Sequence, residues 1–284
     1  MRAFSRFGIT SFAVLTAMIA GMNLAWGAPP TEGSHAVERQ IDFMPAATAH
    51  MQEIIDFHNL LLVIITGITL FVLGLLLWVM VRYNARMNPK PATWSHNTLI
   101  EVVWTIIPIL ILGLIAIPSI RLLREGEIVP PNVDLTVKAI GHQWYWSYEY
   151  PDHGGMTFDA LMLSDEEAKK AGEPRLLGVD NRVVVPIGKV VRVIVTSQDV
   201  IHSWTIPAFG SKIDAVPGKL NETWFKAERE GVFYGQCSEL CGAKHAYMPI
   251  AVEVVSQERF DQWIEEAKKK FAAADGAPTA LAAR

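Results

Sequence analysis

The sequence predicts a two-helix transmembrane hairpin followed by an all-β domain outside the membrane. Two runs without a charged side chain, 60–81 and 102–120, predict the spanning helices. At ~1.5 Å per residue, both runs come close to the ~30 Å thickness of the hydrocarbon layer. A buried core helix is the alternative, but a helix of this length that is apolar on every side favours the membrane. After residue 124, short β-branched and aromatic runs separated by turn residues indicate a β-sandwich or barrel.

Residues 1–27 have the form of a secretory signal peptide. Arg2 and Arg6 precede an apolar stretch, and small residues at 25 and 27 stand where a signal peptidase would cut. A first transmembrane anchor is the alternative, although the apolar stretch is short for a span. Export would place the next segment, 28–59, on the oxidising side of a membrane.

The charges of the connecting segments predict the orientation of the hairpin. The loop 82–98 contains three basic residues and no acidic one, so the positive-inside rule makes it cytoplasmic. The segment 28–59 is acidic, which agrees with a periplasmic position. With a second span at 99–123, the β domain at 124–256 returns to the periplasm. A C-terminal helix and tail, 257–284, follows there.

The amino-acid composition indicates which classes of protein this chain can belong to. Of the 284 residues, 51% are apolar, which is high for a soluble chain, and the net charge of −4 argues against a general nucleic-acid binder. Two cysteines can form one disulfide or share one metal site. The predicted strands of the external domain are 133–140, 144–150, 182–186, 190–196, 222–227 and 250–255, with a polar helical insert at 164–172 and an amphipathic helix at 257–273.

Four metal-binding side chains lie within twelve residues: Cys237, Cys241, His245 and Met248. Thiolate and thioether are soft ligands and imidazole suits copper, so this set selects copper over magnesium, calcium or manganese. A single blue-copper site needs only one cysteine, whereas a second cysteine lets each sulfur bridge two metals. A second metal would need another imidazole, and His202 on a neighbouring loop could supply it.

Two other interpretations of the cysteine pair stay open at this point. In an exported protein, Cys237 and Cys241 could form a local disulfide. A zinc site is also possible, but zinc loops favour other cysteine spacings and have no use for a methionine.

The sequence resembles cytochrome c oxidase subunit II from about residue 50 to residue 255. The matching motifs are GHQWYWSYE at 141–149, DNR at 180–182, DVIHSW at 199–204, DAVPG at 214–218, the cysteine loop at 235–249, and EVVWT at 101–105 in the hairpin. The resemblance implies a cupredoxin-like Greek-key β-sandwich on a two-helix anchor. The signal peptide and the tail outside the match suggest a bacterial form in the inner membrane.

The resemblance also implies a dinuclear copper centre, CuA. Cys237 and Cys241 would bridge the two coppers, and His202 and His245 would each bind one of them. Met248 and the backbone carbonyl of Glu239 would complete the two coordination spheres. The implied activity is transfer of electrons from cytochrome c through CuA to haem in subunit I. Haem and CuB of that partner would reduce O2 to water with proton pumping.

Further roles follow from the same resemblance. Trp144 would be the electron entry point, Glu101 the entrance of a proton path, and the Glu239 carboxylate a ligand of Mg²⁺ shared with subunit I. The implied docking acids for cytochrome c are Glu149, Asp159, Asp180, Asp199 and Asp214. Each role has a plainer alternative: a core tryptophan, a helix-start carboxylate, a loop acid, or a solvated charge.

Two other functions remain to be compared with this interpretation. Quinol oxidase subunit II shares the implied fold but lacks the copper ligands that this sequence contains. A membrane-tethered β domain with one disulfide could instead serve assembly or binding without redox chemistry. Uptake of two coppers by the periplasmic domain would identify an electron carrier and would argue against both alternatives.

Overall fold

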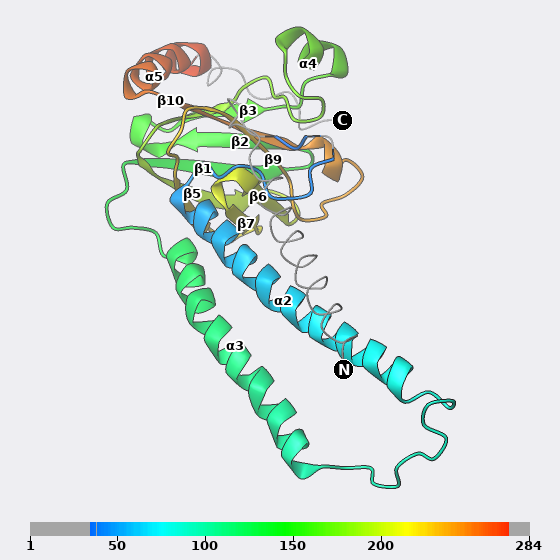
Figure 1. Ribbon diagram of the computed structural model, residues 1–284. Helices are drawn as coiled ribbons and strands as arrows, with labels where there is room; N and C mark the ends of the chain where they lie inside the picture. Colours follow the sequence, from blue (N-terminus) through cyan, green and yellow to red (C-terminus); the bar gives the residue numbers. More distant parts are fainter. Residues whose placement is uncertain (1–34, 38, 273–284) are drawn as a thin grey trace. The chain divides into compact units, whose positions relative to one another are not determined.

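The computed structural model describes residues 35–272 except residue 38. The predicted signal peptide 1–27 and the tail after residue 272 lie outside the described residues. Within the described chain, two long helices precede a β domain, and a short insert helix and a final helix accompany the strands (Figure 1).

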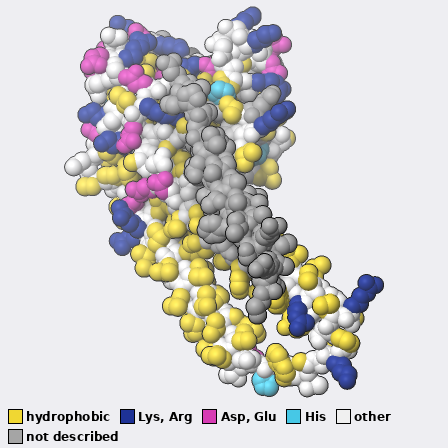
Figure 2. Space-filling model, viewed as in Figure 1, with side chains coloured by type: hydrophobic (Ala, Val, Ile, Leu, Met, Phe, Trp, Pro, Cys, Tyr) yellow, Lys and Arg dark blue, Asp and Glu magenta, His cyan; other side chains and the backbone are white. Residues whose placement is uncertain are grey.

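The two long helices are α2 (Ala49–Arg82) and α3 (Thr98–Glu127). Both are long and apolar enough to cross a membrane, and their apolar windows are 0% buried within the chain itself. Figure 2 shows hydrophobic side chains along the parts of the helices that are visible in this view. Helix α2 begins N-terminal to the predicted span 60–81, because the Thr48 side chain caps it by accepting a hydrogen bond from the Met51 N–H. The predicted hairpin of two apolar helices is confirmed.

The β domain contains three described sheets. Their strand orders are β3-β2-β1-β5-β8, β4-β10-β9 and β6-β7. Strand β1 runs parallel to β5 and β4 runs parallel to β10, while the other paired strands are antiparallel. The bounds are β1 Leu135–His142, β2 Tyr145–Tyr150, β3 Met156–Ala160, β4 Val183–Pro186, β5 Val190–Ser197, β6 His202–Ile206, β7 Ser211–Ala215, β8 Asn221–Lys226, β9 Gly231–Gln236 and β10 Pro249–Val255.

All six predicted strands occur in this domain, with ends shifted by a few residues. Four further strands, β3, β6, β7 and β9, were not predicted. The polar insert forms α4 (Asp165–Ala171), with a capping box at Ser164, and the amphipathic helix forms α5 (Gln257–Ala272). The predicted β-sandwich is therefore confirmed, with more strands than the sequence indicated.

The core lies between the sheets and is rich in aromatic residues. Trp146, Tyr148 and Tyr150 alternate along β2, and all three are fully buried. The Tyr150 hydroxyl donates to the Val184 carbonyl at 2.9 Å and accepts from the Val184 N–H at 3.0 Å. Because β2 and β4 belong to different sheets, this side chain links the two layers.

Strand β9 approaches β6 so closely that only glycine fits at position 235. A Cβ atom built on Gly235 would lie 1.7 Å from the Thr205 carbonyl oxygen. Since Cys237 follows two residues later, this contact helps set where the cysteine loop begins.

We predict that Gly235→Ala destabilises the β domain by about 1–3 kcal/mol or more, because the methyl group must displace backbone. The matched control is Gly218→Asn, since a Cβ at Gly218 meets nothing within 4 Å and asparagine tolerates its positive φ. Chemical denaturation followed by tryptophan fluorescence measures both variants. Equal stability of Gly235→Ala and wild type would contradict the close approach.

Candidate metal centre

Three chain segments meet at one end of the β domain. The first is the turn between β1 and β2, the second is the start of β6 at His202, and the third is the loop between β9 and β10. Because β9 and β10 are antiparallel neighbours, with Gln236 opposite Pro249, the loop that joins them begins and ends at the same place. The predicted ligand residues are all carried by the second and third segments.

The structure brings the six predicted copper-binding groups into one cluster. Each contact joins a cysteine sulfur to another candidate ligand. The distances are 3.9 Å for Cys237 Sγ to Cys241 Sγ, 3.8 Å for Cys237 Sγ to His202 Nδ1, 3.6 Å for Cys241 Sγ to His245 Nδ1, 3.8 Å for Cys241 Sγ to Met248 Sδ, and 3.3 Å for Cys237 Sγ to the Glu239 carbonyl oxygen. His202, Met248 and both cysteines are buried, so water is largely excluded.

The geometry separates the alternatives for the cysteine pair. A disulfide needs an S–S distance of about 2.05 Å, whereas the two sulfur atoms are 3.9 Å apart and both cysteines are free. Met248 is 1% exposed and its sulfur contacts that of Cys241, so a thioether belongs to the donor set. A soft set of two thiols, two imidazoles and a thioether fits copper.

The two thiols differ in how readily they ionise. Burial disfavours the Cys237 thiolate, but hydrogen bonds with His202 and the loop backbone outweigh it and lower the pKa of Cys237 to about 6. Burial raises the pKa of Cys241 to about 12, and the charge of Cys237 adds to this rise. The cluster thus accommodates one negative charge by itself, and a second thiolate calls for cations beside it.

A carboxylate outside the cluster orients His202. Asp199 Oδ1 lies 2.8 Å from His202 Nε2. A carboxylate at this position accepts a hydrogen bond, so Nε2 carries a proton, and a metal would bind in place of the proton on Nδ1, which faces Cys237. Metal-binding histidines commonly have such a partner.

Glycine allows the His202 ring to take this position. A Cβ on Gly141, in β1, would lie 2.7 Å from the ring carbon Cδ2 of His202. In the cysteine loop, Gly242 has φ +125°, and a Cβ there would lie 3.0 Å from the Trp144 ring. Both positions therefore require the absence of a side chain.

Trp144 differs from the other aromatic residues of its motif. Trp146, Tyr148 and Tyr150 are core residues of β2, as the plainer interpretation expects. Trp144 precedes β2, is only partly buried, and packs against Gly242 in the cysteine loop. Its ring centroid lies 5.9 Å from Lys244 Nζ. The structure thus places Trp144 beside the metal cluster.

The other predicted site residues are more scattered. Glu239 is exposed, and only its carbonyl contacts the cluster in the described contacts. Glu101 lies in the first turn of α3, where its carboxylate accepts a hydrogen bond from the Asn97 N–H at 3.2 Å. This contact is what a helix-start carboxylate would make.

The predicted docking acids differ in how their carboxylates are engaged. Glu149 pairs with Lys138 at 3.1 Å, and Asp159 accepts a hydrogen bond from the Ser147 hydroxyl at 2.6 Å. Asp214 is exposed on β7, and its recorded hydrogen bond is made by its backbone carbonyl. The engagement of Asp199 by His202 was not expected, although an acid three residues before a ligand histidine was visible in the sequence.

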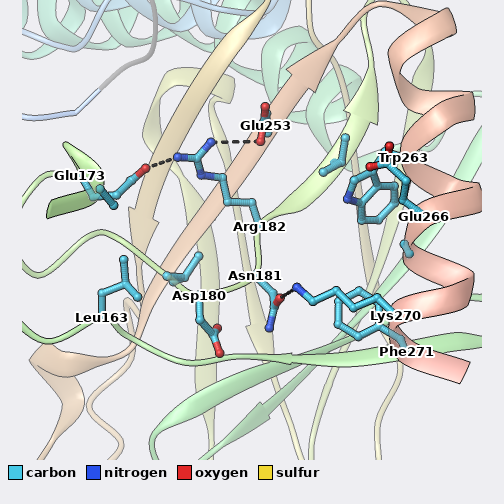
Figure 3. A pocket seen from close by; sticks show the side chains of 14 residues that line it. Leu163, Glu173, Asp180, Asn181, Arg182, Glu253, Trp263, Glu266, Lys270 and Phe271 are labelled. Atoms are coloured by element: carbon cyan, nitrogen blue, oxygen red, sulfur yellow. Dashed lines mark hydrogen bonds and ion pairs between the residues drawn. The ribbon is translucent and has the colours of Figure 1, made fainter. Parts of the chain in front are cut away.

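The DNR motif at 180–182 lies at a separate cavity of 490 Å³ (Figure 3). Arg182 points toward two acids there, with Nη1 3.0 Å from Glu253 and Nη2 in contact with Glu173. Asp180 accepts a hydrogen bond from the Leu161 N–H at 2.8 Å. The described residues lining this cavity include no predicted copper ligand. The motif therefore connects the 161–182 segment to β10.

Family comparisons match both halves of the chain. A family model described as the transmembrane domain of cytochrome c oxidase subunit II matches residues 36–122, and one for its periplasmic domain matches residues 135–255. The chain belongs to the cytochrome c oxidase subunit II family. It is thus a membrane protein with a periplasmic, cupredoxin-like domain, and the resemblance inferred from the sequence is confirmed.

Individual relatives within the subunit II family are similar over most of their length. The probable cytochrome c oxidase subunit 2 of Rickettsia bellii is 54% identical over 244 residues, covering 86% of this chain and 89% of the relative. Cytochrome c oxidase subunit 2 of Arabidopsis thaliana is 47% identical over 230 residues, covering 79% of this chain and 88% of the relative. The crystal structure of the periplasmic domain of subunit II of Bradyrhizobium japonicum cytochrome oxidase is 62% identical, covers 51% of this chain and 99% of that one, and has a TM-score of 0.47.

We predict that Gly141→Ala weakens copper binding by roughly tenfold or more, because its methyl group displaces the His202 ring. The control is Gly154→Asn, in a turn where a Cβ meets nothing within 4 Å. Competition titration with a copper chelator measures both affinities. Wild-type affinity in Gly141→Ala would show that the ring position does not matter for copper binding.

Proposed function

We propose that this chain is the electron-entry subunit of a cytochrome c oxidase in the bacterial inner membrane. It would accept electrons from cytochrome c at CuA and deliver them to haem in subunit I, where O2 is reduced to water with proton pumping. The observation that carries the proposal is the cluster of two thiols, two imidazoles and one thioether, in which all groups but the partly exposed His245 imidazole are buried. This donor set also argues against a quinol oxidase subunit and against a non-redox binding domain.

The cluster residues would bind copper in the roles that the sequence suggested. Cys237 and Cys241 would bridge the metals, with His202, His245, Met248 and the Glu239 carbonyl as the remaining ligands. The bound copper pair supplies a one-electron redox centre. The protein keeps the ligands still: Cys237 N–H donates to the Met248 carbonyl at 3.1 Å, and Ser238 N–H donates to the Ser203 carbonyl at 3.0 Å. Rigid, buried ligands reduce the rearrangement that a change of charge requires.

The remaining predicted site residues extend this proposal. Glu101 would stand at the cytoplasmic entrance of a proton path, which is supported by its place at the start of α3. The exposed Glu239 carboxylate would help to hold Mg²⁺ at the contact with subunit I, since this ion prefers oxygen ligands. The same proposal places the loop 82–98 in the cytoplasm and residues 124–256 in the periplasm.

Cytochrome c would dock at acids near the cluster. The candidates are Glu149, Asp159, Asp180, Asp199 and Asp214. The segment 130–256 contains 16 acidic and 12 basic residues, which favours a basic partner weakly. Complementary charge would chiefly raise the association rate, and salt would screen it.

Removing either bridging sulfur tests the copper assignment. Cys237→Ser or Cys241→Ser should abolish the two-copper absorption and the paramagnetic resonance signal of an electron shared by two copper nuclei, because a hydroxyl is a poor substitute for a soft thiolate. Met248→Leu should keep the fold and much of the copper but alter the reduction potential and electron transfer, because a thioether is a weak ligand. Full activity with cytochrome c in the double cysteine variant would refute the assignment.

Replacing Trp144 tests the electron entry point. Trp144→Ala should slow electron transfer from cytochrome c by at least about tenfold, or about 1.4 kcal/mol of barrier, with little change in affinity. Stopped-flow measurement on the assembled oxidase separates the two quantities. Tyr247→Ala is the matched control, since Tyr247 is an exposed aromatic residue of the neighbouring cysteine loop. Equal slowing in the two variants would show that entry is not specific to Trp144.

A further inference from the structure

The Asp199 carboxylate uses both oxygens at the edge of the metal cluster. Oδ1 lies 2.8 Å from His202 Nε2 and accepts the Val200 N–H at 2.6 Å. Oδ2 accepts the Gln143 N–H at 2.7 Å. Although the side chain is 32% exposed, its oxygens are thus bound by groups of the protein. A carboxylate held in this way has little hydrogen-bonding capacity left for a docking partner.

The contact with His202 has a chemical consequence for the cluster. The His202 side chain is 0% exposed and its Nδ1 faces Cys237 at 3.8 Å. By accepting the Nε2–H, Asp199 selects the tautomer in which Nδ1 can donate to a metal. It also makes the ring a stronger electron donor, as carboxylate partners of metal-binding histidines do.

The contact with Gln143 connects the same carboxylate to the Trp144 turn. Gln143 immediately precedes Trp144 and, through its side chain, donates to the Cys241 carbonyl at 2.8 Å. Asp199 and Gln143 together therefore join the loop that carries His202, the turn that carries Trp144 and the loop that carries both cysteines. These three segments are distant in the sequence, and this network holds them beside one another.

We propose that Asp199 is a positioning residue of the metal centre, holding the His202 ring and the Trp144 turn in one hydrogen-bonded network. The inference rests on the proposed copper function. Among the five candidate docking acids, Asp199 is the one whose recorded contacts include a predicted copper ligand. Its loss should therefore change the metal centre itself.

The test compares Asp199→Asn with Asp214→Asn in the full chain loaded with copper. Each variant removes one negative charge, but only Asp199 contacts His202 in the described structure. The amide oxygen of asparagine can accept a hydrogen bond from either His202 or the Gln143 N–H. The amide N–H₂ group then faces the other of these two donors, with which it cannot form a hydrogen bond. Asp199→Asn should lower copper affinity roughly 10- to 100-fold, raise the reduction potential and alter the copper absorption spectrum. Asp214→Asn should leave all three at their wild-type values.

Docking is measured separately, as the salt dependence of the association rate with cytochrome c in the assembled oxidase. Neutralising a docking acid lowers this rate most at low ionic strength, and we expect this effect for Asp214→Asn. Wild-type copper affinity, potential and spectrum in Asp199→Asn, with only the association rate reduced, would overturn the positioning role.

A further variant, Asp199→Glu, keeps the carboxylate and should have a copper affinity between those of Asp199→Asn and the wild type. If Asp199→Asn does not fold, Asp199→Ser takes its place, and wild-type copper affinity, potential and spectrum in that variant would equally overturn the role. Failure of the wild-type chain to bind two coppers would instead refute the proposed function.

Discussion

Two buried sulfur atoms 3.9 Å apart impose the constraint on which the rest of the site depends. Burial opposes a negative charge on each thiol, and a charge on Cys237 raises the pKa of Cys241 further. Two thiolates can occupy such a place only where positive charge compensates them. The other donors are two imidazoles and a thioether, which bring no further negative charge. The cluster is therefore poorly suited to stand empty as core packing and well suited to a pair of copper ions.

The β domain supplies what these ligands need, which is fixed positions. The antiparallel pairing of β9 with β10 closes the cysteine loop, and the absence of a side chain at Gly235 lets β9 approach β6. Tyr150 joins the two larger sheets from within the core. Around this frame, Asp199 and Gln143 connect the surface turn of Trp144 to the buried ligands. The protein surface near the cluster and the candidate metal ligands thus form one connected structure.

Several features of this protein follow from local signals in its amino-acid sequence. Uncharged runs of membrane-spanning length predicted α2 and α3, because the hydrocarbon layer sets both length and polarity. Alternating and β-branched segments predicted six of the strands, and the polar run 164–172 predicted α4. The cysteine loop was recognisable because five of its six candidate ligand groups lie between residues 237 and 248. In each case the information lies within a few neighbouring residues.

Other features depend on partners that are distant along the chain, and they become visible in the folded protein alone. Strand β6 is buried although it contains His202, Ser203 and Thr205. Because these residues are polar, the sequence did not indicate a buried strand here. Strand β9 begins with a glycine and contains Gly235, which weakens its strand signal. The contact between Gln143 and Asp199 spans 56 residues, and the one between Gln143 and Cys241 spans 98. Which acid supports a ligand and which faces solvent depends on hydrogen bonds across such separations, and short-range residue patterns carry no information about them.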